Sequence, residues 1–150
     1  MIEVIISLLL VTVSALGILA LNAHSTREVA HLKFQNQAEA LGQQLLMRAS
    51  INANTANRDV YAVSGNTALQ GPNCMNATCS DNEIANKDIA DWTQELTDAL
   101  PNSSYQAQWN QDNLIVAIKW QGIAKSNNTN CLFDNLQPNE SCRTYVRKIL

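Results

Sequence analysis

Hydrophobic residues dominate the start of the chain. Residues 4–21 form a stretch of eighteen residues without charge or proline. As an α-helix rising about 1.5 Å per residue, this stretch would extend roughly 27 Å, close to the roughly 30 Å of a bilayer's hydrocarbon core. It carries neither basic residues at its head nor an Ala-x-Ala cleavage site, so we expect an anchor and not a cleaved signal peptide. The pattern predicts a membrane-spanning segment over residues 1–23 and a globular domain over 24–150.

The polar sequence that follows keeps helical spacing. One apolar stripe recurs at the helical period through Ala30, Phe34, Ala38, Leu41, Leu45 and Ala49. The helix should therefore continue as an amphipathic element and end near Ile51. The asparagine-rich run at residues 52–57 disfavours continuation, because asparagine side chains compete for backbone hydrogen bonds.

A second helix is predicted over residues 86–100, followed by Pro101. Its inward face is Ile89, Trp92, Leu96 and Ala99. The acidic side chains Asp88, Asp91, Glu95 and Asp98 are assigned to a solvated face. Residues 60–63 favour a short strand within an otherwise irregular loop.

After residue 101 the spacing of apolar residues changes from the helical period to every second residue. Alternating runs at residues 105–109 and 114–120, joined by the polar link 110–113, predict a β-hairpin, and residues 144–150 supply a third strand. Trp92, Trp109 and Trp120 each fall on an apolar phase and are assigned to the core. The predicted fold class is α+β, a long N-terminal helix packed on a small antiparallel sheet.

Four cysteines, Cys74, Cys79, Cys131 and Cys142, all lie after the apolar stretch. An even number of cysteines favours disulfides, and the spacings do not match a zinc site. Three pairings are open, and we favour Cys74–Cys79 and Cys131–Cys142 because each pair is local and brackets a turn-rich stretch. Disulfides indicate an oxidising compartment, most simply a bacterial periplasm.

Composition and motifs point away from catalysis. The net charge is -3 and the basic residues are dispersed, so no nucleic-acid partner is predicted. No nucleophile elbow, phosphate loop or metalloprotease helix occurs, and we expect no enzyme activity, small-molecule substrate, cofactor or metal. His24 and His31 lie two helical turns apart, about 10 Å along the axis, too far for one ion.

The first residues resemble the N-terminal motif of type IV pilins. In that family Gly-Phe is followed by a small or hydroxyl residue, Leu or Met, Ile, Glu and Val, and then a long apolar helix. Met1-Ile2-Glu3-Val4 matches the inner part of this motif, and residues 16–21 are similar to a Leu-Gly-Leu-Ala segment of PilV-type minor pilins. Residues 88–101 and 116–120 also resemble PilV-type segments. Because the match begins inside the motif, we expect a short basic leader ending in Gly to be encoded upstream of Met1.

The resemblance implies a role in type IV pilus assembly or initiation, and through it in twitching motility, adhesion or DNA uptake. It implies an inner-membrane protein with a periplasmic domain, which joins other minor pilins and the major pilin of the fimbrium through its N-terminal helix. Glu3 matches the family glutamate that is implied to attract the N-terminal amine of a neighbouring subunit. A carboxylate beside hydrocarbon is also costly, and such residues are functional by default.

Two other functions remain open from the sequence. A pseudopilin of type II secretion shares the N-terminal motif, and gene neighbourhood would separate it from a minor pilin. A membrane-tethered periplasmic binding or sensor module would instead have a cytoplasmic stretch upstream of Met1.

Overall fold

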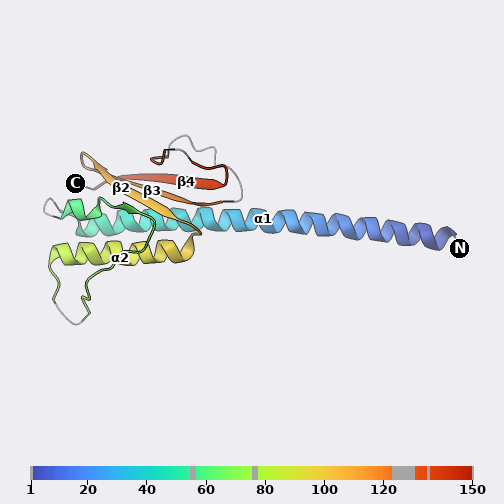
Figure 1. Cartoon of the computed structure of the whole chain (residues 1–150), viewed down its shortest axis with the longest axis horizontal. Coiled ribbons are helices and arrows are strands. Elements are labelled where there is room, and N and C mark those ends of the chain that lie inside the picture. The colour runs from blue at the N-terminus through green and yellow to red at the C-terminus, as the bar shows by residue number, and fades with distance from the viewer. Residues whose placement is uncertain (1, 55–56, 76–77, 123–130, 135, 150) are drawn as a thin grey trace. The chain divides into compact units, whose positions relative to one another are not determined.

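A computed structural model describes residues 2–54, 57–75, 78–122, 131–134 and 136–149 (Figure 1). The elements in chain order are helix α1 (Ile2–Asn52), 3-10 helix η1 (Arg58–Tyr61), strand β1 (Ser64–Gly65), helix α2 (Asp81–Ala99), and strands β2 (Ser104–Asn110), β3 (Asn113–Gln121) and β4 (Glu140–Lys148). Internal contacts divide the chain into two compact units, residues 1–33 and 34–150. Helix α1 contributes to both units.

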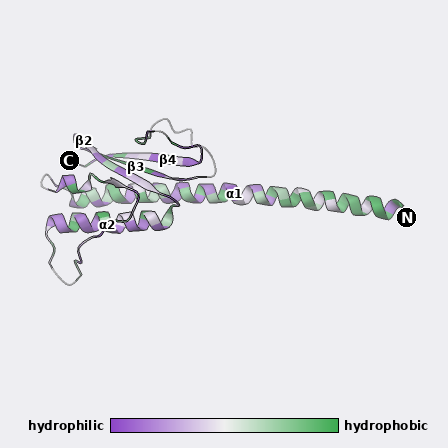
Figure 2. Ribbon diagram, in the orientation of Figure 1, coloured by the Kyte–Doolittle hydropathy of each residue, from purple (hydrophilic) through white to green (hydrophobic). Residues whose placement is uncertain are grey.

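The first unit is the N-terminal part of α1. Its apolar side chains are exposed, with Ile2 at 71% and Leu21 at 72%, and Figure 2 shows the hydrophobic colour running along this part of the helix. Among the described residues, α1 is the helix that is long and apolar enough to cross a membrane. An exposed surface of this kind requires an apolar environment such as lipid or other helices.

The second unit is an α+β domain. Its four-stranded antiparallel sheet has the order β1-β2-β3-β4. Alternate residues of the strands face the helices: Ala107 of β2 is paired with Val116 of β3, which is paired in turn with Tyr145 of β4, and all three are buried. The buried side chains of α1 from Ala38 to Ala49 and of α2 from Ala85 to Leu96 form one hydrophobic core with this face. The long helix and small antiparallel sheet predicted from the sequence are confirmed.

Trp92 lies where α1, α2 and the sheet meet. It is fully buried, and its indole Nε1 donates a 2.8 Å hydrogen bond to the carbonyl oxygen of Leu41 in α1. Its ring meets that of Tyr105 in β2 edge-on, with 5.5 Å between centroids. Such an edge contact adds about 0.5–1.5 kcal/mol beyond the apolar area buried. One side chain therefore joins the three parts of the core.

The stripe predicted on α1 faces this core from Phe34 onward, whereas Ala30 belongs to the first unit. Ala38, Leu41, Leu45 and Ala49 are buried and Phe34 packs at the margin. Gly42 lies on the same face, and a Cβ at this position would overlap the ring of Tyr145 in β4. The missing side chain lets β4 approach the helix axis closely.

Helix α2 starts at Asp81, five residues before the predicted start. The sequence Ser80-Asp81-Asn82-Glu83 forms a capping box, in which Glu83 Oε2 accepts hydrogen bonds from the backbone N (2.8 Å) and Oγ (2.7 Å) of Ser80. Satisfying these N-terminal groups stabilises the first turn, although its residues are exposed. These two hydrogen bonds also hold the pKa of the Glu83 carboxyl below its usual range.

The short strand predicted at residues 60–63 is wrong. Asn54 and Asn57 form reciprocal hydrogen bonds, backbone N to side-chain Oδ1 in both directions, at 2.7 and 3.1 Å. They lead into the 3-10 helix Arg58–Tyr61, and the strand β1 follows at Ser64–Gly65. Side-chain bonding by asparagine competes with extended structure here.

The predicted hairpin is confirmed with a tighter turn. Asn110 is paired with Asn113, so the link consists of Gln111 and Asp112, and Gln111 has a positive φ of 56°. Strand β4 begins at Glu140, four residues before the predicted start, because it pairs with the full length of β3. Residue 150 lies outside the described residues.

Removing residues 1–23 should give a soluble, monomeric domain, because the continuous apolar span is then absent while the described core, which begins at Ala38, is retained. Membrane flotation and analytical ultracentrifugation measure this directly. A fragment that still requires detergent would contradict a single anchor.

Gly42→Ala should destabilise the domain by about 1–3 kcal/mol, because the added methyl group overpacks the contact with Tyr145. The sign of this stability change identifies the cause, since replacing Gly by Ala in a helix interior ordinarily stabilises by about 1 kcal/mol. Thermal unfolding of the detergent-solubilised chain provides the measurement. Gly17→Ala is the matched control, because an added Cβ there meets nothing within 4 Å, and it should leave the domain's unfolding unchanged.

Candidate functional site

Glu3 lies in the first turn of α1 and is exposed. Its neighbours Ile2 and Val4 are 71% and 69% exposed. The first backbone N–H groups of a helix have no intrahelical partner and carry partial positive charge, so a carboxylate at this position is favourable. The Glu3 carboxylate thus lies at the N-terminal end of an apolar helix surface. No other described residue of the first unit buries this surface.

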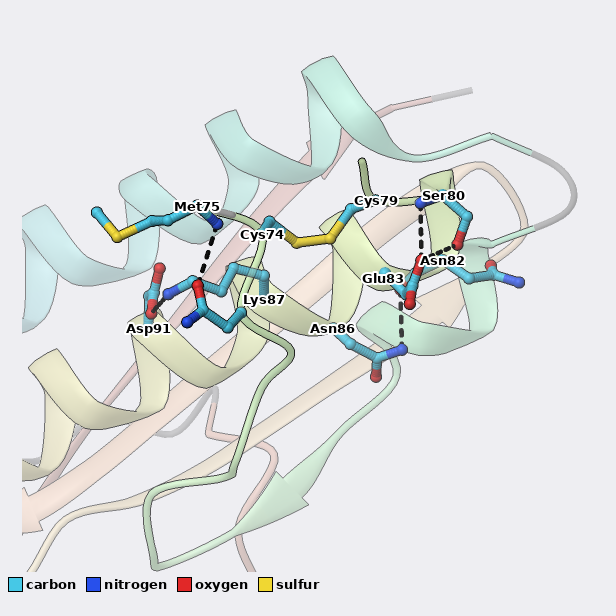
Figure 3. Close-up of a disulfide and its surroundings, with 10 residues drawn as sticks. Cys74, Met75, Cys79, Ser80, Asn82, Glu83, Asn86, Lys87 and Asp91 are labelled. Carbon is cyan, nitrogen blue, oxygen red and sulfur yellow. Dashed lines mark hydrogen bonds and ion pairs between the residues drawn. A yellow bond between two sulfur atoms is a disulfide. The ribbon is translucent and has the colours of Figure 1, made fainter. Parts of the chain in front are cut away.

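The cysteines lie in the second unit. Cys74 and Cys79 are joined by a disulfide with Cα atoms 5.6 Å apart, and Cys131 and Cys142 by another with Cα atoms 6.1 Å apart. The first lies just before α2 (Figure 3), and the second links β4 to the segment that precedes it. These are the two local pairings favoured from the sequence.

A polar seam joins α1 to α2, made of Gln44, Arg48 and Asn52 on α1 and Asp88 and Glu95 on α2. Arg48 donates to Glu95 Oε1 at 3.0 Å and to the carbonyl oxygen of Asp88 at 3.1 Å. Gln44 Nε2 donates to Glu95 Oε2 at 2.7 Å. The assignment of Asp88 to a solvated face is therefore wrong, because Asp88 is half-buried and bonded to α1. Glu95 is exposed, as assigned, and also pairs with α1.

Asp88 is the most connected member of the polar seam. Its Oδ2 accepts hydrogen bonds from Asn52 Nδ2 at 2.6 Å and from the Tyr61 hydroxyl at 2.9 Å. Burial and this hydrogen bond to the carboxylate raise the pKa of Tyr61 above its ordinary value. Asp88 thus links α2 to the end of α1 and to η1.

The assignment of the tryptophans to the core holds for Trp92 and Trp120, which are 0% and 1% exposed. Trp109 is half-buried at the margin. Its Nε1 donates to the carbonyl oxygen of Arg58 at 2.7 Å, and the Arg58 guanidinium carbon lies 4.7 Å from its ring centroid. The indole N–H and the ring of Trp109 both contact Arg58, and these two contacts hold η1 against β2.

A shallow cavity of about 220 Å³ lies where α1 ends and α2 begins, lined by Ile51, Asn52, Ala53, Asn54, Asp81 and Ile84. Asn54 Nδ2 donates to Asp81 Oδ2 at 3.3 Å across it. In the part of the chain that the structure describes, no three His, Cys, Asp or Glu side chains gather as a metal site. His24 instead lies 4.0 Å from Glu28 on the same helix.

Sequence reasoning missed the capping box and the polar seam. The signal for the first was present as Ser-x-x-Glu at residues 80–83. For the second, Gln44, Arg48 and Asn52 recur every four residues, which places them on one helix face. Only the packing of α2 on that face shows which acidic residues they meet.

No protein-family model, curated protein or solved structure matches this chain. The functional argument therefore rests on the residues themselves.

Ultraviolet absorbance titration should show that the three tyrosines resist ionisation in the folded protein. Burial is the leading cause that raises the pKa of Tyr61, Tyr105 and Tyr145. Because the folded-state pKa lies above the unfolded value of about 10, the stability that these groups contribute is complete below about pH 10. It is lost as the pH rises through the folded-state values, so tyrosinate should appear together with unfolding.

The control is the same titration in denaturant, where all three phenols should ionise near pH 10. Tyr61→Phe should remove one third of the total absorbance change. Ionisation of all three tyrosines at the denatured-state pH, in protein that remains folded, would contradict the burial argument.

Proposed function

We propose that this chain is a minor pilin, a membrane-anchored subunit that takes part in type IV pilus assembly or initiation. Its function is binding and not catalysis: the N-terminal helix joins a bundle with the helices of other minor pilins and the major pilin, and the domain caps or spaces that bundle. The subunit would be held in the bacterial inner membrane with its domain in the periplasm, and would enter the pilus on assembly.

The observation that carries the proposal is the exposed apolar surface of α1 with Glu3 in its first turn. From residue 4 to residue 21 this surface has no charge, so apolar contacts with lipid and with other helices differ little in free energy. Hydrophobicity alone therefore gives a subunit little reason to leave the membrane in one defined register. A carboxylate supplies a directional interaction.

In a helical bundle an unpaired carboxylate would cost several kcal/mol, whereas one beside a positive amine would be favoured. The amine at the N-terminus of a neighbouring subunit, formed when a leader is removed, is the partner that the resemblance implies. Glu3 would then select the register between subunits without contributing to the stability of the domain. The two disulfides accord with a domain that works in an oxidising compartment.

Glu3→Val should leave expression, membrane insertion and the thermal stability of the domain unchanged, while lowering copurification with partner pilins and the number of pili per cell. The substitution removes the charge and keeps the helix apolar. The change should be made in the full-length precursor, because the neighbouring amine arises only after leader removal. Glu3→Asp should give an intermediate result, since it keeps the charge and loses reach.

Glu28→Val is the matched control. It removes an exposed carboxylate from the same helix at a position outside the apolar stretch, where a surface contact of this kind contributes about 0–1 kcal/mol. It should assemble as the wild type does. If the Glu3→Val protein copurifies with partner pilins at the wild-type level, Glu3 has no role in assembly and the main support for the proposal is lost.

A further inference from the structure

Strand β4 is the last strand in the order β1-β2-β3-β4 and pairs with β3 along its full length. In the part of the chain that the structure describes, residues 143–148 form no backbone hydrogen bond to any segment other than β3. Unpaired N–H and C=O groups on the edge of a sheet are a template for a further strand. This edge is therefore open to β-strand addition.

Two hydrogen bonds show which way the backbone groups of β4 point. The N–H of Gly122 donates to the carbonyl oxygen of Asn139 at 2.7 Å, and the N–H of Ile149 donates to that of Asp112 at 2.9 Å. Each pair continues the register of β3 and β4 by one residue. Hydrogen-bonded and non-hydrogen-bonded pairs alternate along an antiparallel ladder, so the odd-numbered residues of β4 are those bonded to β3.

The even-numbered residues Thr144, Val146 and Lys148 therefore direct their N–H and C=O groups toward the open edge. Their side chains lie on the sheet face opposite that of Tyr145, which is buried against α1. Val146 is 60% exposed and is paired with Ile115 of β3. The edge thus presents free backbone groups next to an exposed apolar side chain.

The charge along this edge is positive. Arg143 and Arg147 lie two residues on either side of Tyr145 and are exposed. Among the described residues, neither arginine forms an ion pair within 4.0 Å, whereas Lys148 Nζ lies 3.9 Å from Asp112 Oδ2. The whole chain has a net charge of -3, so the positive charge is a local property of β4. Opposite charges on neighbouring strands stabilise their pairing, and a second β4 would bring the same cations.

We propose that the β4 edge binds an extended, acidic segment of a partner protein as a fifth strand. The backbone groups of residues 144, 146 and 148 supply the hydrogen bonds, and the side chains beside them supply the specificity. The segment that fits has two acidic side chains four residues apart, which face Arg143 and Arg147, and an apolar side chain opposite Val146. The site lies apart from the apolar surface of α1, so it does not depend on the pilin proposal.

The test uses the full-length, detergent-solubilised protein and the peptide acetyl-Thr-Glu-Val-Thr-Val-Glu-Thr-amide. Its sequence reads the same in both directions, so either strand orientation brings the glutamates to the same face. Fluorescence anisotropy measures the affinity, and amide exchange followed by NMR should show protection of the N–H groups of Thr144, Val146 and Lys148. A peptide with lysine in place of both glutamates should bind at least about tenfold more weakly, because like charges then face each other.

Val146→Pro tests the backbone contribution. It removes one N–H that faces the open edge and none that bonds to β3, a position at which an edge strand accepts proline. The affinity for the acidic peptide should fall by roughly tenfold, since a hydrogen bond is lost and the ring obstructs the added strand. Val146→Thr is the matched control, because it keeps the N–H and the branched side chain, and it should bind as the wild type does. Circular dichroism verifies that each variant is folded.

The double variant Arg143→Glu, Arg147→Glu tests the charge at two exposed positions, where folding should be unaffected. It should reverse the preference, so that the lysine peptide binds more tightly than the glutamate peptide. The proposal is overturned if the acidic peptide does not bind at millimolar concentration, if both peptides bind the wild type equally, or if folded Val146→Pro binds with wild-type affinity. Tighter binding of a single-stranded DNA oligonucleotide than of the acidic peptide would assign the cations to phosphate and would also overturn it.

Discussion

The second unit depends on the hydrogen bond and ring contact of Trp92. A buried indole N–H usually has a hydrogen-bond partner, and for Trp92 the partner is the carbonyl oxygen of Leu41 in the C-terminal part of α1. This fixes α2 along its length relative to residues 34–52 of α1. The edge contact with Tyr105 then fixes both helices relative to β2. The same α2 position brings Asp88 within reach of Asn52 and Tyr61, so the polar seam follows from the buried tryptophan.

The fold was largely predictable because its elements have clear periods. The stripe on α1 and the inward face of α2 recur at the helical period. Buried positions recur at period two in β2 and at most positions of β3, so element type and hairpin pairing follow from local pattern. Boundaries were less predictable, since Ser80 and Glu83 extend α2 through side-chain bonds and not through hydrophobicity. The 3-10 helix at residues 58–61 had no signal in apolar spacing, because Asn54 and Asn57 set it up by bonding to each other's backbone.

Some residues of the candidate site could likewise be recognised from the sequence, and others could not. Glu3 stands out in sequence because it is a lone charge beside a long apolar stretch, and burial plays no part in recognising it. The roles of Asp88 and Glu95 could not be read from sequence, since acidic residues on a helix face look alike whether they meet water or an arginine. Likewise the cysteine spacings favour local pairs, whereas the burial of Cys142 appears only when β4 is placed beside β3.

The position of β4 at the edge of the four-stranded sheet affects how readily two copies of the domain could pair. A terminal strand of nine residues offers backbone groups that another sheet can extend. Three cationic side chains, Arg143, Arg147 and Lys148, stand exposed along this strand. Two copies that approached by these edges would bring like charges together. The exposed charges therefore disfavour edge-to-edge pairing of two sheets.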